Sequence, residues 1–181
     1  MTALDNSVLA VLFALRDPSF VQFFTAITQF GSTFVVGGIA LAIGFSLLAR
    51  SRLADFAGLC ISVMGTIIVV FPLKDIVARA RPDILYQAFS EDTFSFPSGH
   101  AAFSIALYGF LAYLAWKQLP RPQAIAVTVF AALLIGLIGF SRLYLGLHFV
   151  SDVLGGYLIG GAFTALGIWV SERLTRHPVW S

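Results

Sequence analysis

Two histidines and an aspartate stand at the edges of apolar stretches, where titratable side chains are rare. His100 belongs to FPSGHAAFS, residues 96–104, and His148 and Asp152 belong to LHFVSD, residues 147–152. Residues four apart share a helical face, so Asp152 can accept the proton of one His148 nitrogen. That contact fixes the tautomer and leaves the other nitrogen free to attack, which is the orienting logic of catalytic triads. The pattern predicts nucleophilic and acid–base chemistry.

A second group of residues suits a bound anion. Lys74 and Arg81 are seven residues apart, about two helical turns, so they share a face if the helix continues that far. Arg142 adds a fixed cation whose planar donor fork fits phosphate. Ser98 is a good N-cap for the apolar stretch that follows, and Gly99 lets the backbone N–H groups of that helix N-terminus approach a ligand. The spacing predicts a phosphate cradle beside a titratable histidine.

Other charged residues nearby are interpreted as solvent-facing. The first predicted helix of the site ends at Arg81-Pro82, because a residue before proline disfavours the helical conformation. Arg79 points to another face of this helix, and we expect it to be solvated or to contact lipid headgroups. Glu91 and Asp92 lie in the long polar loop Lys74–Pro97. They are placed to influence headgroup choice, but a solvated loop is the preferred interpretation.

The composition is that of an integral membrane protein. Of its 181 residues, 59% are hydrophobic and 11% charged, and the mean hydropathy is +0.91. An ordinary soluble domain is about 25% charged. The net charge of +2, without a basic patch interleaved with aromatic residues, excludes a nucleic-acid partner. We expect residues 1–181 to form one domain, and the sequence predicts no oligomeric state.

Apolar stretches predict an all-α membrane bundle of about five transmembrane helices. A spanning helix needs about 20 mostly apolar residues. Five stretches qualify: one within Pro18–Ala49, then Phe56–Leu73, Ser98–Trp116, Gln123–Phe140 and Phe149–Ser171. Gly31-Ser32 is expected to divide the first into an interfacial piece and a span. The stretch Val8–Leu15 lacks the basic leader of a signal peptide and is expected to form a short interfacial helix.

The basic residues predict the orientation of these spans. With five spans, six basic residues share the side of the C-terminal tail: Arg50, Arg52, Lys117, Arg121, Arg173 and Arg176. The two sides are nearly balanced until Lys74, Arg81 and Arg142 are assigned to chemistry, and the remaining bias then follows the positive-inside rule. The tail is therefore expected to be cytoplasmic, and the site is expected to face outward.

The three polar groups together resemble a known signature. The spacings are Lys74-x6-Arg81-Pro82, then Pro97-Ser98-Gly99-His100, then Ser141-Arg142-x5-His148-x3-Asp152. This arrangement is similar to the three-part signature of the type 2 phosphatidic acid phosphatase family of membrane lipid phosphatases. Many relatives have six spans, whereas this chain has five and a short N-terminal segment.

The resemblance implies a role for each signature residue. His148 would be the nucleophile that forms a phospho-histidine, and Asp152 would orient it. His100 would protonate the leaving lipid oxygen and then help water to hydrolyse the intermediate. The remaining positions would hold the phosphate oxygens: Lys74, Arg81, Ser98, Gly99 and Arg142. The family needs no metal or other cofactor.

The substrate class implied is a lipid phosphate in a bacterial inner membrane. Phosphatidate, phosphatidylglycerophosphate and polyprenyl diphosphates all qualify, and analogy favours a polyprenyl diphosphate such as undecaprenyl diphosphate. Three other functions remain open: a phosphotransferase that passes the phosphate to another lipid, a non-catalytic lipid-phosphate binder or transporter, and a vanadium-dependent haloperoxidase. The haloperoxidases are soluble proteins, so the five predicted spans argue against that class. A protein that only binds a lipid phosphate does not require a nucleophile with its orienting carboxylate, which argues against a binder or transporter.

Overall fold

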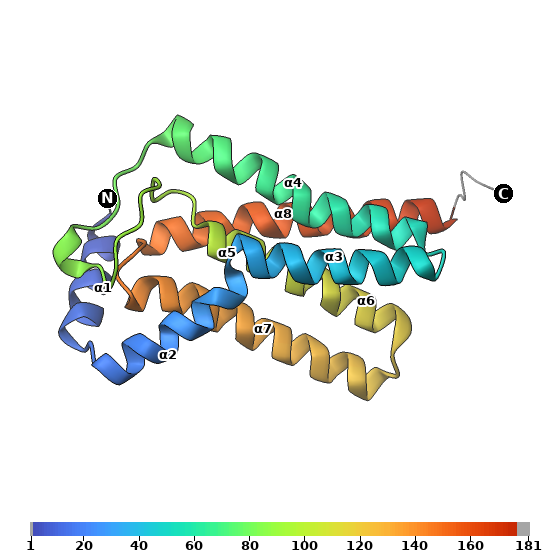
Figure 1. The fold of residues 1–181 in the computed structure, drawn as a ribbon, viewed down its shortest axis with the longest axis horizontal. Helices are drawn as coiled ribbons and strands as arrows, with labels where there is room; N and C mark the ends of the chain where they lie inside the picture. The colour runs from blue at the N-terminus through green and yellow to red at the C-terminus, as the bar shows by residue number, and fades with distance from the viewer. Residues whose placement is uncertain (1, 177–181) are drawn as a thin grey trace.

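Helices and their connections make up the computed structural model, which describes residues 2–176 and contains no β-strand within them (Figure 1). The helices are α1 (Ala3–Ala14), α2 (Pro18–Thr28), α3 (Thr33–Ala49), α4 (Leu53–Val77), α5 (Gly99–Ser104), α6 (Phe110–Gln118), α7 (Arg121–Tyr144) and α8 (Val150–Arg176). A π-helical stretch, Ile105–Gly109, joins α5 to α6. Of the predicted domain 1–181, residues 1 and 177–181 lie outside the described residues.

The predicted membrane spans are confirmed as helices. Four helical segments are long and apolar enough to cross a membrane: α4, the continuous α5–α6 segment, α7 and α8. The pair α2 and α3 forms a fifth candidate span, bent by 44° at the break. The break falls at Gly31-Ser32, as expected, and the Ser32 hydroxyl accepts a hydrogen bond from Val35 N at the start of α3. The short N-terminal helix α1 is present as well.

The helices α4 and α8 pack closely along their lengths (Figure 1). Gly58 and Gly167 allow this packing, because a Cβ added to Gly58 would lie 2.6 Å from the Gly167 carbonyl oxygen. Near the other end of α8, a Cβ added to Gly156 would lie 2.5 Å from the carbonyl oxygen of Ser98. These small residues let α5 rest directly on α8, and this contact brings PSGH close to Asp152.

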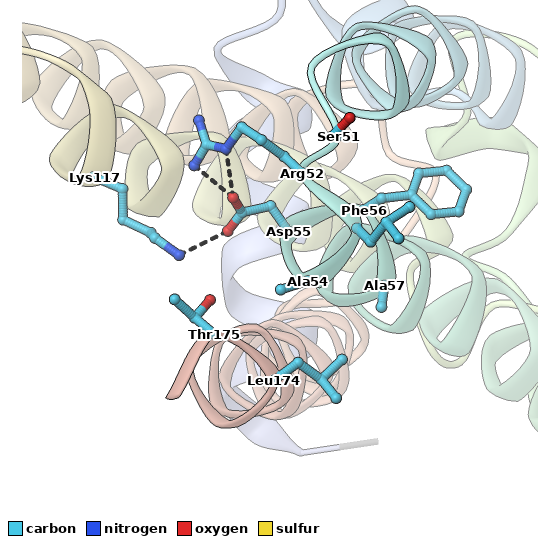
Figure 2. Close-up of a pocket in the computed structure, with 10 residues that line it drawn as sticks. Ser51, Arg52, Ala54, Asp55, Phe56, Ala57, Lys117, Leu174 and Thr175 are labelled. Atoms are coloured by element: carbon cyan, nitrogen blue, oxygen red, sulfur yellow. Dashed lines mark hydrogen bonds and ion pairs between the residues drawn. The ribbon is translucent and has the colours of Figure 1, made fainter. Parts of the chain in front are cut away.

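One end of the bundle is tied by charged groups beside a cavity of about 630 Å³ (Figure 2). Asp55, in the first turn of α4, accepts hydrogen bonds from Arg52 Nε at 2.7 Å and Lys117 Nζ at 2.8 Å (Figure 2). Its other partner is Ser171 Oγ on α8, at 2.7 Å. The charged groups of this cavity therefore satisfy one another and join α4, α6 and α8. The predicted catalytic residues lie elsewhere, towards the opposite end of α4, where Lys74 occupies the last turn.

Candidate active site

A smaller cavity of about 100 Å³ collects residues that are far apart in the sequence. Its lining comes from α3, α4, the α4–α5 loop, α5 and the connection between α7 and α8: Thr33, Phe71, Lys74, Arg81, Glu91, Thr93, Gly99, His100, Phe103 and His148. Five of the predicted site residues therefore line one pocket. The other three lie in direct continuity with it, since Ser98 adjoins Gly99, Arg142 binds Glu91, and Asp152 lies against His148.

His148 is buried and fixed on both ring nitrogens. Its Nε2 lies 3.2 Å from Arg81 Nη1, and its Nδ1 lies 3.5 Å from Asp152 Oδ2. A guanidinium can only donate, so Nε2 faces it with a lone pair, and the ring proton belongs on Nδ1. Burial lowers the pKa of His148 well below 6.5, and the nearby cations Arg142, Arg81 and Lys74 lower it further. These contacts and the lowered pKa favour a neutral imidazole with its lone pair on Nε2.

Asp152 is fully buried and holds this tautomer. Its Oδ2 accepts hydrogen bonds from Ser95 Oγ at 2.5 Å and from Phe149 N at 2.8 Å. Ser95 Oγ also lies 3.4 Å from His148 Nδ1, so the serine sits between the two catalytic groups. The predicted shared helical face is wrong in detail, because α8 begins at Val150 and His148 precedes it. The turn closed by Phe149 keeps the pair adjacent.

Three cations surround the cavity and also anchor the chain. Lys74 Nζ donates to the Phe94 carbonyl at 2.6 Å. Arg81 donates to the Thr93 carbonyl at 2.7 Å and to the Leu147 carbonyl at 2.8 Å. Arg142 is only 1% exposed and donates to Thr28 Oγ1 of α2 at 3.1 Å. The cations thus hold the α4–α5 loop and α2 around the pocket.

Two buried polar atoms at the site have no hydrogen-bond partner: Arg142 Nε and Ser98 Oγ. Ser98 occupies the predicted N-cap position, but its hydroxyl makes no capping hydrogen bond, so that part of the prediction is wrong. Buried polar atoms without partners are rare in folded proteins. Both belong to residues predicted to hold phosphate, and a bound oxyanion would satisfy them.

Glu91 is part of the site, which corrects the prediction of a solvated loop residue. Its Oε2 lies 2.7 Å from Arg81 Nη2, and its Oε1 pairs with Arg142 Nη2. Burial opposes ionisation, but the charges of Arg142, Arg81 and Lys74 outweigh it and lower the pKa of Glu91 below 4.5. A carboxylate therefore occupies the donor forks of two arginines that were predicted to hold phosphate.

Arg79 was expected to face solvent or lipid headgroups, and this is also wrong. The helix α4 ends at Val77, earlier than predicted, and Ala78 turns the chain with a left-handed φ of 49°. Arg79 then points inward, and its Nη1 donates to Asp152 Oδ1 at 2.6 Å. The sequence missed this contact because the predicted helix placed Arg79 on the wrong face. It missed Ser95 as well, for which the only signal was proximity to PSGH.

The loop between α4 and α5 is polar on its inner side and apolar on its outer side. Phe94 and Thr93 offer their carbonyl groups to the site, as described above. On the outer side of the loop, Ile84 and Leu85 of the short 3₁₀ turn Ile84–Tyr86 are 62% and 76% exposed.

Within residues 2–176, no three His, Cys, Asp or Glu side chains gather so as to hold a metal ion. The expected independence from metals stays a prediction.

Comparisons with known proteins agree with this geometry. A family model described as the PAP2 superfamily matches residues 55–176. Phosphatidylglycerophosphatase B of Bacillus subtilis (strain 168) is 33% identical over 175 residues, which cover 95% of this chain and 85% of that protein. The crystal structure of a transmembrane PAP2-type phosphatidylglycerolphosphate phosphatase from Bacillus subtilis matches with a TM-score of 0.87 and 29% identity, over 96% of this chain and 87% of that one. The structure of Aquifex aeolicus LpxE matches with a TM-score of 0.72 and 26% identity, over 93% and 96% of the two chains.

The fold and these likenesses define a multi-pass membrane enzyme of the phosphatase class. The chain belongs to the PAP2 superfamily, whose model covers most of it, including every residue of the cavity from α4 to α8. The family resemblance in the sequence is confirmed, as is the all-α membrane bundle. The roles of individual residues remain predictions.

Proposed function

We propose that the protein hydrolyses a phosphate monoester or diphosphate on a membrane lipid through a phospho-histidine at His148. The observation that carries this proposal is the Nε2 atom of a neutral, buried imidazole at a cavity walled by cations. A site that merely binds phosphate needs the cations but gains nothing from a carboxylate behind a histidine. Asp152 and the fixed tautomer therefore favour nucleophilic catalysis over binding or transport.

The charge of the cavity fits a phosphate. Lys74 and Arg81 on the cavity wall, together with Arg142 paired to Glu91 behind it, carry three positive charges, and Glu91 carries one negative charge, which leaves an excess of two positive charges. A phosphate dianion would neutralise this excess, and its oxygens would supply partners for Arg142 Nε and Ser98 Oγ. The volume of about 100 Å³ suits the phosphate alone. The lipid tail would therefore remain in the bilayer.

The reaction divides into two displacement steps. In the first, Nε2 of His148 attacks phosphorus, the phosphorus–oxygen bond to the lipid breaks, and His100 donates a proton to the leaving oxygen. Asp152 stabilises the positive ring that results, and the three cations stabilise charge on the equatorial oxygens. In the second step His100 takes a proton from water, the water oxygen attacks phosphorus, and the bond to His148 breaks. Inorganic phosphate leaves, and both histidines return to their initial states.

Phosphatidylglycerophosphate is the substrate that the Bacillus relative's name favours, because that protein is covered over 85% of its length. Undecaprenyl diphosphate was the preference from analogy, and phosphatidate has the same chemical group. The cavity contacts only the phosphate region and so does not separate these lipids. We therefore propose the class and leave its members to a direct comparison of rates.

The site is proposed to face outward from a bacterial inner membrane, with the last turn of α8 on the cytoplasmic side. The helix ends opposite the site carry most of the basic residues that remain once Lys74, Arg81 and Arg142 are set aside: Arg50, Arg52, Lys117, Arg121, Arg173 and Arg176. Arg16 and Arg79 lie at the other end. That bias follows the positive-inside rule. Labelling single cysteines introduced at Asp92 and at Arg173 in intact cells would test it, and selective outward labelling at Arg173 would refute this orientation.

The function is tested by phosphate release from the purified protein in detergent with EDTA present. Phosphatidylglycerophosphate, undecaprenyl diphosphate and phosphatidate would be compared side by side, with His148→Ala as the control. We expect release that depends on His148 and an acid-labile phosphoenzyme in a rapid quench. Appreciable turnover by His148→Ala would refute the nucleophile. Loss of lipid phosphate without release, on addition of an acceptor lipid, would indicate a phosphotransferase instead.

A further inference from the structure

A buried chain of charges runs from α1 to the back of the catalytic aspartate. We propose that Arg79, held in place by Asp5 of α1, is a positioning residue that fixes Asp152 and thereby the reactive tautomer of His148. This inference rests on the phospho-histidine function proposed above. Arg79 lies outside the catalytic signature, so the inference adds a residue and an element to the site.

Arg79 contacts the catalytic pair in two independent ways. Its Nη1 donates to Asp152 Oδ1 at 2.6 Å and supplies the partner for the carboxylate oxygen that faces away from His148. Its backbone carbonyl accepts from Ser95 N at 2.8 Å. Ser95 is the residue whose hydroxyl lies between Asp152 and His148. Arg79 therefore holds both groups that orient the Nδ1 side of the imidazole.

Asp5 fixes the guanidinium from the other side. It is only 2% exposed, and its Oδ2 lies 3.1 Å from Arg79 Nη2. Asp5 also accepts from Ser151 N at 3.0 Å and from Ser151 Oγ at 2.8 Å, which ties it to the first turn of α8 beside Asp152. The partners are 74 residues apart in the sequence, so the contact is a tertiary one.

The helix α1 uses Asp5 in its own capping box, where Asp5 Oδ2 accepts a hydrogen bond from Thr2 N at 3.2 Å, as well as in the contact with Arg79. It lies outside the spanning bundle, at the end where α7 meets α8 (Figure 1). An arginine between two buried carboxylates leaves one negative charge beside His148 Nδ1. That is the charge needed to stabilise the imidazolium of the phosphoenzyme. Without Arg79, Asp152 would lose its partner on Oδ1 and would be held only through Oδ2, by Ser95 and Phe149.

The test compares Arg79→Ala, Arg79→Lys and Asp5→Asn with Arg52→Ala as a matched control. Arg52 also pairs with a buried aspartate and is similarly exposed, 23% against 19% for Arg79, but it lies at the opposite end of α4. We expect Arg79→Ala to lower kcat about 10²-fold with KM within about threefold, since loss of a supporting partner typically costs 10–100-fold. Arg79→Lys should recover part of this, and Asp5→Asn should lose less. Arg52→Ala should retain kcat.

A double variant separates positioning from mere stabilisation. If Arg79 acts through Asp152, then adding Arg79→Ala to Asp152→Asn should change kcat less than threefold. Additive losses would overturn the proposal. A second result would also overturn it. This is an Arg79→Ala protein whose kcat equals that of the wild type, in a series in which Arg79→Lys or Asp5→Asn is folded.

A spectroscopic readout is independent of phosphatase activity. In ¹⁵N-histidine spectra, with His148→Ala to assign the signal, the wild type should show His148 protonated on Nδ1. Arg79→Ala should mix the two tautomers of His148, because the orientation of Asp152 is less well fixed. Arg52→Ala should leave the signal unchanged. If His148 keeps the same tautomer in Arg79→Ala, the inference is refuted. If the tautomer changes in Arg79→Ala but the wild-type protein has no phosphatase activity, only the proposed function is refuted.

Discussion

Glu91→Gln should tighten the binding of substrate, because Glu91 occupies the donor forks that the phosphate would use in the proposed mechanism. In the structure the carboxylate pairs with both Arg81 and Arg142. Substrate must displace it, so the apparent affinity is reduced by the fraction of molecules in which the arginines are free. The glutamine keeps the shape of the side chain and removes its charge.

The magnitude follows from these two contacts. A hydrogen bond to a charged group contributes about 1.5–3 kcal/mol. The Glu91 side chain is 23% exposed, and the incoming phosphate forms new contacts with the arginines in place of both contacts of Glu91. Most of the free energy lost with the Glu91 contacts is therefore regained from the phosphate contacts. A net difference of about 1.4 kcal/mol remains as our estimate, which corresponds to about a tenfold lower KM. The same change leaves buried cations without a counter-ion, and we expect it to lower the free energy of unfolding by about 1–3 kcal/mol.

The effect should be constant across neutral pH. The pKa of Glu91 is lowered from 4.5, so the carboxylate stays ionised at and above that pH and is lost only when the pH falls through the depressed value. Titration of Glu91 should therefore not change KM of the wild type between about pH 5 and 8, and KM should stay above the value of Glu91→Gln throughout this range.

The assay is initial-rate phosphate release at varied lipid concentration, with inorganic phosphate as a competing inhibitor. Both KM and the inhibition constant should decrease in Glu91→Gln, with kcat within about threefold of the wild type. Asp92→Asn is the control, since Asp92 is an exposed neighbour in the same loop. A KM that rises more than threefold would refute the reasoning and would mean that Glu91 keeps the arginines in position.

Three further predictions concern the catalytic groups and the end of α4. His100→Ala should lower kcat by roughly 10²–10⁴-fold through loss of acid–base catalysis, and a loss under tenfold in a single-turnover assay would remove it from that role. Burial and the neighbouring cations lower the pKa of His148 well below 6.5, so the acid limb of kcat/KM that reports its protonation should lie below that pH; a limb above pH 7 would contradict a neutral nucleophile. Ala78→Gly should raise stability by up to about 1 kcal/mol without loss of kcat, because Ala78 has a φ of 49°, and a lower thermal midpoint would show that the alanine is not strained.

The spans were predictable because each is a long apolar run between charges, and this signal depends on local sequence alone. The α4 helix, for example, needed only the stretch between Arg52 and Lys74 to be recognised. The break at Gly31-Ser32 was predictable for the same reason, since a small residue and a good capping residue interrupt a run too long for one span.

The proximity of His148 and Asp152 was predictable, because a spacing of four residues brings two side chains together in a helix or in the turn that precedes it. Glu91 and Arg79 were not, because their roles depend on how the α4–α5 loop folds back across the site. The end of α4 at Val77, rather than at Arg81, turned Arg79 from the surface to the interior. The only local signal for Asp5 was that of a capping box with Thr2, because its other partners come from α8 and the residues just after α4.

The loop from Ala78 to Ser98 has an inner surface that contacts the site and an outer surface that is exposed. Its inner carbonyl groups rest on Lys74 and Arg81, whereas Ile84, Leu85, Phe89 and Phe94 are exposed on it. These apolar side chains are suited to the headgroup region of a bilayer, so we expect lipid packing to help hold Lys74 and Arg81 in place. Turnover should consequently depend on the surrounding amphiphile more steeply than folding does, and a detergent that leaves the bundle intact can still slow the enzyme.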